Sequence, residues 1–189
     1  MRVVAGTAKG ATLFSPRGTK IRPTSDYVKE NLFNIIGDDV RGAAFLDLFA
    51  GTGAIGIEAL SRGAVAATFV DISRVSVDLT KKNLGKVRLS EKSRVIQADV
   101  LAAVKRLSGQ KYDIIFLDPP YFDGFVEKTL EEIHRAAILA DGGCIIVEAG
   151  QPFVIPQPEG FVIYKDREYS GTKLIFLRRA YDGDLPGKF

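Results

Sequence analysis

The stretch Phe45-Leu-Asp-Leu-Phe-Ala-Gly-Thr-Gly-Ala-Ile-Gly56 decides how the rest of the chain is interpreted. It begins as a short apolar strand, passes through the G-x-G-x-x-G turn Gly51–Gly56, and continues as an amphipathic helix that we expect to end at Gly63. A glycine-rich turn between a strand and a helix presents backbone N–H groups to a ligand. The same pattern serves NAD, FAD and S-adenosylmethionine (SAM), and a tight turn without a ligand also fits it. The turn therefore indicates a nucleotide-type cofactor without choosing one.

The composition is that of one compact domain. The chain has 189 residues, of which 46% are hydrophobic, so it can bury one core but hardly a second. It begins without the apolar segment of a signal peptide, and no apolar run reaches the ~18 residues of a membrane span. We therefore expect a cytoplasmic protein without membrane contact. The single cysteine, Cys144, lies in an apolar run, which predicts a buried, inert thiol and excludes disulfides and zinc fingers.

Strands and helices alternate along the middle of the chain. After the first strand we expect strands at residues 66–71, 94–97, 112–118 and 143–149, and helices at 73–84 with Gly85 as C-terminal cap, at 100–107, and from the loop after residue 118 to about Leu139. This alternation predicts an α/β fold with a Rossmann-like, doubly wound, mostly parallel sheet. Residues 161–164 and 174–177 have no helix between them, which predicts an antiparallel hairpin at one edge.

The N-terminal part differs in charge from the rest. Residues 1–24 contain five basic residues and no acidic one. The basic residues are Arg2, Lys9, Arg17, Lys20 and Arg22. A solvated surface without function is one explanation, but the lack of carboxylates favours contacts with phosphates. We therefore expect residues 1–37 to form a basic hairpin and a helix capped by Thr24 or Ser25, residues 38–180 the main domain, and residues 181–189 a flexible tail.

Acidic residues gather at the expected carboxyl ends of the strands, where ligands of doubly wound sheets bind. Asp47 lies within the first strand, and Asp71, Asp99 and Asp118 end or follow later ones. Each could cap a neighbouring helix or turn, but their shared position favours a ligand. Asp71 lies where an acidic group receives the ribose hydroxyls of an adenosine nucleotide. Carboxylates around the site would repel a pyrophosphate and attract a sulfonium cation, by ~4 kcal/mol for charges ~4 Å apart, so SAM is favoured over NAD.

The motif Asp118-Pro119-Pro120-Tyr121 indicates the chemistry. Two prolines hold the backbone extended, so the Asp118 carboxylate and the Pro119 carbonyl can point at one position. An exocyclic base amine is a poor nucleophile, and two acceptors holding its two hydrogens would align its lone pair with a methyl group. Tyr121 or Phe122 can stack on the base. A simple stiffening of the loop is the alternative explanation.

These motifs together resemble a known family. The chain is similar to class I SAM-dependent amino-methyltransferases and, more closely, to the bacterial small-subunit rRNA guanine-N2-methyltransferase family, RsmD. The similarity extends to about Arg179, and it rests on Met1-Arg-Val-Val-Ala-Gly6, Arg22-Pro-Thr-Ser-Asp26, Val28-Lys-Glu-Asn-Leu-Phe33, the block Asp47–Gly63, and Asp118-Pro-Pro-Tyr121. One departure is Asp71-Ile-Ser, where glutamate is common in the family.

The resemblance implies the class I methyltransferase fold and N2-methylation of one guanine in 16S rRNA, within an assembled or partly assembled small subunit. We expect a monomer and assign no metal ligands. The implied catalytic residues are Asp118, Pro119 and Tyr121. The implied SAM-binding residues are Asp47, Phe49, Gly51, Thr52, Gly53, Asp71, Ile72, Asp99, Val100 and Asp118. The implied RNA-binding residues are Arg2, Lys9, Arg17, Lys20, Arg22, Tyr121 and Phe122.

Three other interpretations remain open. A small NAD-dependent oxidoreductase shares the glycine turn and Asp71 but leaves the motif at Asp118 without a role. It also needs a proton donor, and we assign no role to the only histidine, His134, because it falls inside a helix. A non-catalytic RNA-binding or ribosome-assembly module would use the basic arm alone. Among methyltransferases, adenine-N6 and DNA targets also fit an amine-binding motif.

Overall fold

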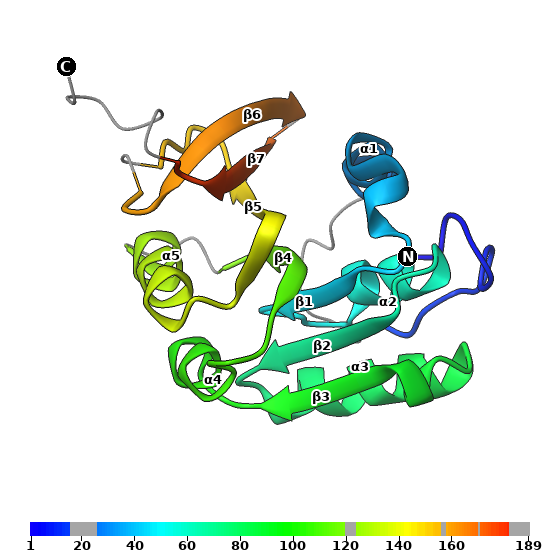
Figure 1. Ribbon diagram of the computed structural model, residues 1–189. Helices are drawn as coiled ribbons and strands as arrows, with labels where there is room; N and C mark the ends of the chain where they lie inside the picture. The colour runs from blue at the N-terminus through cyan, green and yellow to red at the C-terminus, as the bar shows by residue number, and fades with distance from the viewer. Residues whose placement is uncertain (16–25, 120–123, 156–157, 170, 182–189) are drawn as a thin grey trace, which may run out of the picture.

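The computed structural model describes residues 1–15, 26–119, 124–155, 158–169 and 171–181 (Figure 1). The expected helix cap at Thr24 or Ser25, the second half of the basic arm and the expected tail from residue 182 on lie outside the described residues. The division of the chain at residue 38 stays a prediction.

The described strands form one seven-stranded sheet with the order β3-β2-β1-β4-β5-β7-β6. The strands are β1 (Ala44–Leu48), β2 (Ala66–Asp71), β3 (Ser93–Gln97), β4 (Tyr112–Leu117), β5 (Leu139–Gly150), β6 (Phe161–Tyr169) and β7 (Thr172–Arg179). Strand β7 is antiparallel to both of its neighbours, β5 and β6, and the other described pairs of neighbouring strands are parallel. The predicted doubly wound, mostly parallel sheet and its C-terminal antiparallel hairpin are confirmed.

Helices cover both faces of this sheet (Figure 1). They are α1 (Asp26–Ile36), α2 (Ala54–Ser61), α3 (Arg74–Lys86), α4 (Val100–Arg106) and α5 (Phe125–Ala136), with the short 3-10 helices η1 (Gly37–Val40) and η2 (Ser90–Lys92). Successive strand residues point to opposite faces, so Phe45 joins one buried cluster and Leu46 the other. Helices α1, α2 and α3 pack on the first cluster, whereas α4 and α5 pack on the second.

Two predicted helix ends are wrong. Helix α3 continues through Gly85 to Lys86, and Arg88 (φ 58°), not the glycine, takes the left-handed conformation beyond it. Helix α5 ends at Ala136 rather than near Leu139, because Ala137 turns left-handed (φ 52°) and β5 starts two residues later. An alanine rarely adopts this conformation, so the sequence carries no local signal for that end.

The carboxyl ends of β1, β2, β4 and β5 share one edge of the sheet, since these strands are parallel. The loops that follow them, including the glycine turn, therefore meet at this edge. None of the helices in the described part of the chain has the length and apolar character that crossing a membrane requires.

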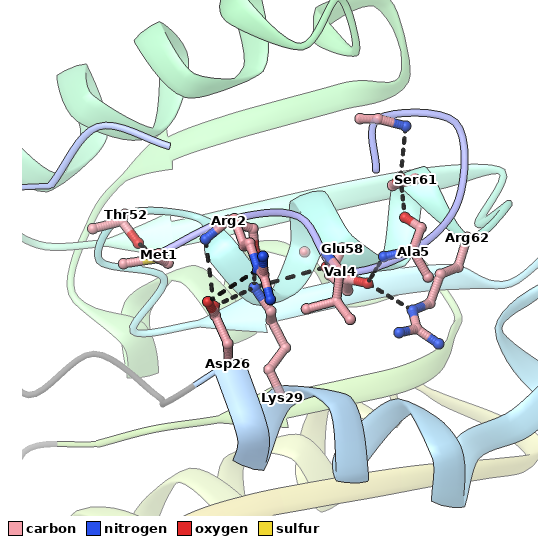
Figure 2. Close-up of polar contacts among 12 residues, drawn as sticks. Met1, Arg2, Val4, Ala5, Asp26, Lys29, Thr52, Glu58, Ser61 and Arg62 are labelled. Carbon is pink, nitrogen blue, oxygen red and sulfur yellow. Dashed lines mark hydrogen bonds and ion pairs between the residues drawn. The ribbon is translucent and has the colours of Figure 1, made fainter. Parts of the chain in front are cut away.

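The predicted N-terminal hairpin is present within residues 1–15 and is held against α2 by buried polar groups (Figure 2). The Glu58 carboxylate accepts hydrogen bonds from the backbone N–H groups of Val4 (2.7 Å) and Ala5 (2.9 Å) and from Arg62 Nε (2.8 Å). The ammonium group of Lys29, from α1, lies 3.7 Å from the same carboxylate and donates to the Arg2 carbonyl. Glu58 and Lys29 are both fully buried. One carboxylate thus joins the hairpin, α1 and α2.

Candidate active site

The glycine turn connects β1 to α2, and its shape depends on contacts within the protein. Gly53 has a left-handed φ of 76°, and a Cβ atom there would lie 2.8 Å from Thr80 Cγ2. Gly56 lies against β2, where a Cβ atom would come within 2.3 Å of the Phe69 ring. Glycine at this position therefore lets α2 lie close against β2. At Gly53 the left-handed backbone and the packing against α3 both require glycine.

Asp71, the last residue of β2, fixes the turn from the neighbouring strand. Its carboxylate accepts hydrogen bonds from the backbone N–H groups of Gly51 and Ser73, both at 2.8 Å. A carboxylate offers about four acceptor positions, so two remain after these bonds within the described part of the chain. The next residue, Ile72, leaves 68% of its surface exposed. The end of β2 therefore presents free acceptor positions beside an exposed apolar side chain.

Asp47 lies below the turn and is almost completely buried. Its carboxylate accepts a 2.9 Å hydrogen bond from the backbone N–H of Gly56, near the start of α2. Burial raises the pKa of Asp47 well above its ordinary value; the hydrogen bond from Gly56 opposes this shift, and the negative charges of Asp118 and Asp71 add to it. In the structure Asp47 holds α2 to β1 from within the core.

Asp118 directly follows β4, and Pro119 after it is buried. Burial, followed by the negative charge of Glu148, raises the pKa of Asp118 to about 8. Glu148 belongs to β5 and is buried. Our sequence reasoning missed Glu148, although a carboxylate inside the apolar run Cys144-Ile-Ile-Val-Glu148 was a signal that could have found it.

The remaining expected cofactor residues have identifiable positions. Phe49 has an uncommon left-handed φ of 64° and packs edge-to-face on Phe125 with ring centroids 6.3 Å apart. Thr52 is buried, and its hydroxyl lies 3.3 Å from the sulfur of Met1. The Asp99 carboxylate caps α4 by accepting from Ala102 N–H at 3.0 Å. Val100, the first residue of α4, is buried.

The structure thus brings Asp47, Asp71 and Asp118 to one edge of the sheet around the glycine turn. Asp99 lies next to that edge, because the N–H of Ala98 bonds to the carbonyl of Asp71. Its carboxylate has the capping role that we considered as the alternative. Five of the expected site residues, Arg17, Lys20, Arg22, Tyr121 and Phe122, lie outside the described residues.

Two of the expected RNA-binding residues are described. The Arg2 side chain is 70% exposed, and its Nε lies 3.7 Å from an Asp26 carboxylate oxygen. Lys9 is exposed near the tip of the hairpin. Both are on the surface, but Arg2 has an acidic neighbour that the sequence of residues 1–24 did not reveal.

Cys144 and His134 lie away from the glycine turn. Cys144 is half-buried rather than buried, at the other end of the sheet, and burial, followed by the negative charge of Asp39, raises the pKa of its thiol to about 12. The thiol therefore stays protonated, in agreement with the predicted lack of reactivity. His134 is exposed on α5 and packs edge-to-face on Phe161.

Relatives of known sequence cover nearly all of the chain. A Bacillus subtilis protein named "Putative rRNA methyltransferase YlbH" is 38% identical over 175 residues, 90% of this chain and 94% of that protein. "Ribosomal RNA small subunit methyltransferase D" of Escherichia coli is 35% identical over 185 residues, 97% and 92% of the two chains.

Solved structures agree with the fold. The structure of "Putative methyltransferase yhhF" from Escherichia coli has a TM-score of 0.85 at 28% sequence identity and covers 96% of this chain and 99% of its own. The sheet is therefore that of a class I methyltransferase. The family model described as "Conserved hypothetical protein 95" matches residues 1–178. With a match over nearly its whole length, this chain belongs to the Conserved hypothetical protein 95 family.

Proposed function

We propose that this protein transfers a methyl group from SAM to the exocyclic N2 amine of a guanine in 16S rRNA. The observation that carries the proposal is the placement of Asp118 directly after β4, at the edge of the sheet where Asp71 holds the glycine turn. The relatives named as small-subunit rRNA methyltransferases support rRNA as the substrate.

The charges of the site favour SAM over a dinucleotide. The negative charges of Asp118 and Asp71 both act on Asp47, and Glu148 adds a fourth carboxylate that acts on Asp118. A bound sulfonium cation would favour the ionised form of these carboxylates, whereas a pyrophosphate would be repelled by that form. The pKa of Asp118 is raised because the carboxyl group is buried and lies near Glu148 in the protein without a bound cation.

Three parts of the site would hold SAM. The two free acceptor positions of Asp71 suit the ribose hydroxyls. The exposed side chain of Ile72 offers an apolar surface to the adenine. The turn Gly51–Gly53, with Phe49 before it, borders the place for the methionine part, and Asp99 and Val100 follow on the adenine side.

Asp118 and Pro119 would bind the acceptor amine. The carboxylate of Asp118 and the carbonyl of Pro119 each accept one N–H of the amine, which directs the nitrogen lone pair towards the methyl group. SAM supplies an electrophilic methyl group on a cationic sulfur. The carboxylate is most useful as positive charge develops on nitrogen, and the methylated amine then loses a proton readily. Tyr121 or Phe122 would stack on the guanine after it leaves its helix.

We further propose that the enzyme acts as a cytoplasmic monomer on the small ribosomal subunit or an assembly intermediate of it. The basic arm, with Arg2, Lys9, Arg17, Lys20 and Arg22, would contact RNA phosphates. The lack of acidic residues in residues 1–24 supports this role, although Asp26 neutralises part of the charge of Arg2.

The test uses methyl-labelled SAM with small subunits, and separately with naked 16S rRNA, from cells that lack the corresponding methylation. The label should appear on N2 of one guanine, found by digestion and mapping of the modified nucleotide. Label on an adenine or on DNA would replace the acceptor that we propose. A melting temperature raised by NAD but not by SAM would favour the oxidoreductase, and RNA binding without any methyl transfer would favour an assembly module.

A further inference from the structure

Helix α3 and the N-terminal hairpin form one continuous surface with an unusual arrangement of charge. The exposed ring of Phe14, at the end of the hairpin strand, lies under two ammonium groups of α3. The Nζ atom of Lys82 is 4.2 Å from the ring centroid, and that of Lys86 is 4.5 Å from it. Both lysines are exposed.

The backbone beneath this arrangement is fixed. The side chain of Asn83, fully buried, accepts from the Phe14 N–H at 2.7 Å and donates to the Phe14 carbonyl at 3.1 Å. Lys86 Nζ also donates to the Thr12 carbonyl at 2.5 Å. The hairpin therefore places Phe14 on α3 through several hydrogen bonds, and the position of the ring does not depend on the cation–π contacts alone.

Two like charges held over one ring repel each other, and lysines four residues apart on a helix destabilise it slightly for this reason. The ring face attracts each ammonium group and so offsets part of this repulsion. Within the described residues, neither ammonium group forms an ion pair with a carboxylate. The acidic residue one turn before Lys82, Asp78, lies 3.4 Å from Arg74 instead.

The residues around Lys82 and Lys86 in the sequence are also mainly basic. Between positions 74 and 94 the sequence contains seven basic residues and two acidic ones. An excess of this size on one helix and its flanks suits a polyanion better than a single small anion, because phosphates repeat along a nucleic-acid backbone.

We propose that the surface formed by Phe14, Lys82 and Lys86 is a second RNA-binding surface, which takes the sugar–phosphate backbone of the substrate RNA beyond the acceptor site. Lys82 and Lys86 contact neighbouring phosphates, and Phe14 keeps their ammonium groups in position. The identity of the RNA as 16S rRNA rests on the proposed function. The proposal that this surface binds RNA does not. It extends the expected RNA-binding region from residues 1–24 to a helix of the main domain.

The test is the salt dependence of RNA binding, measured by fluorescence anisotropy with labelled 16S rRNA fragments in the presence of the demethylated product of SAM, so that no methyl transfer is needed. Replacing both Lys82 and Lys86 by alanine should lower the slope of log affinity against log salt by about 0.7–0.9 for each lost phosphate contact. Phe14→Leu should weaken binding at low salt with both charges kept.

The matched control is the double change of Arg106, the last residue of α4, and Lys111, just before β4, to alanine. Both are exposed, and Lys111 Nζ donates to the backbone carbonyl of Ala137, as Lys86 Nζ does to that of Thr12. The control should bind RNA with the slope of the unsubstituted protein. SAM affinity, measured by calorimetry, should be unchanged in all variants and shows that they are folded. Equal slopes for the α3 variant and the control would overturn the proposal. A protein that binds RNA as described but methylates none would contradict the proposed function and not this surface.

Discussion

The Asp71 carboxylate accepts a 2.8 Å hydrogen bond from the backbone N–H of Gly51, so the end of β2 holds the glycine turn that follows β1. A second bond from the Ser73 N–H orients the same carboxylate at the start of α3. The residue that we propose for binding the ribose therefore also shapes the turn, and its replacement should affect both functions.

Asp71→Ala should lower SAM affinity by about 1.5–3 kcal/mol, the strength of a charge-assisted hydrogen bond. It should also destabilise the free protein by about 1–3 kcal/mol, because two backbone N–H groups lose their acceptor. Asp71→Asn keeps one acceptor oxygen and should be less affected in both. Calorimetric titration and thermal unfolding without ligand separate the two effects. Unchanged SAM affinity in Asp71→Ala would show that the ribose is bound elsewhere.

SAM binding should depend on pH through Asp118. The folded-state pKa of about 8 lies above the ordinary value, so the free enzyme holds a proton on Asp118 at neutral pH. The stability linked to this proton is complete at low pH and is lost as the pH rises towards 8. A bound sulfonium cation favours the carboxylate form, so binding at pH 7 should release protons, and the affinity should increase up to about pH 8.

Proton release can be measured by calorimetric titration of SAM in two buffers that differ in ionisation enthalpy. Asp118→Asn, which cannot ionise, should remove most of the release while still binding SAM. Equal apparent enthalpies in both buffers for the unsubstituted protein would contradict the assignment. Asp47→Asn serves as a second variant, because burial raises the pKa of Asp47 too.

The buried Glu58 should be among the most important residues for stability. Glu58→Ala leaves the ammonium group of Lys29 buried without this partner and removes the acceptor of two hairpin N–H groups. Breaking a buried ion pair in this way costs about 3–5 kcal/mol. Replacing Lys29 by methionine as well should recover part of the loss, since the charge is then gone but the N–H groups stay unpaired. A cost below about 1 kcal/mol in denaturant unfolding would show that water or another group replaces the carboxylate.

Two glycine-to-alanine changes should have opposite effects on the free energy of unfolding. At Gly56 the new Cβ atom would lie 2.3 Å from the Phe69 ring, so the change should destabilise the protein by about 1–3 kcal/mol. At Gly85, within α3, no atom lies within 4 Å of the new Cβ atom, and alanine should stabilise the helix by about 0.5–1 kcal/mol. Urea unfolding of both variants measures the difference. A destabilised Gly85→Ala would mean that α3 does not continue through this position in solution.

The sequence predicted the fold well because the repeated pattern of apolar strands and helices is a strong signal. The sequence predicted all five parallel strands, from the first strand to the one at residues 143–149. It also predicted that Asp71 and Asp118 lie at the same edge of the sheet. The predicted helix ends at Gly85 and about Leu139 were wrong, because α3 continues to Lys86 and α5 ends at Ala136. Glycine in a helix and alanine in a left-handed conformation both contradict the usual signals.

Long-range contacts at the site were less predictable. The link between Glu148 and Asp118 depends on the pairing of β4 with β5, which brings residues thirty positions apart into neighbouring strands. The contact of Lys82 and Lys86 with Phe14 likewise depends on how the hairpin docks on α3. No local pattern encodes either arrangement, so only the three-dimensional structure shows them.

The most direct test of the central claim is the single-turnover rate of methyl transfer by Asp118→Ala, with SAM affinity measured on the same sample. We expect SAM still to bind through the proposed ribose and methionine contacts on other strand ends, with reduced affinity towards pH 8, where the sulfonium loses a charge partner. At saturating SAM the rate should be lower by two or more orders of magnitude, which corresponds to a loss of about 3 kcal/mol of transition-state stabilisation. The rate of Asp118→Asn should fall between those of the unsubstituted enzyme and Asp118→Ala. A rate close to that of the unsubstituted enzyme at saturating SAM would remove Asp118 from the reaction and contradict amine methylation at this site.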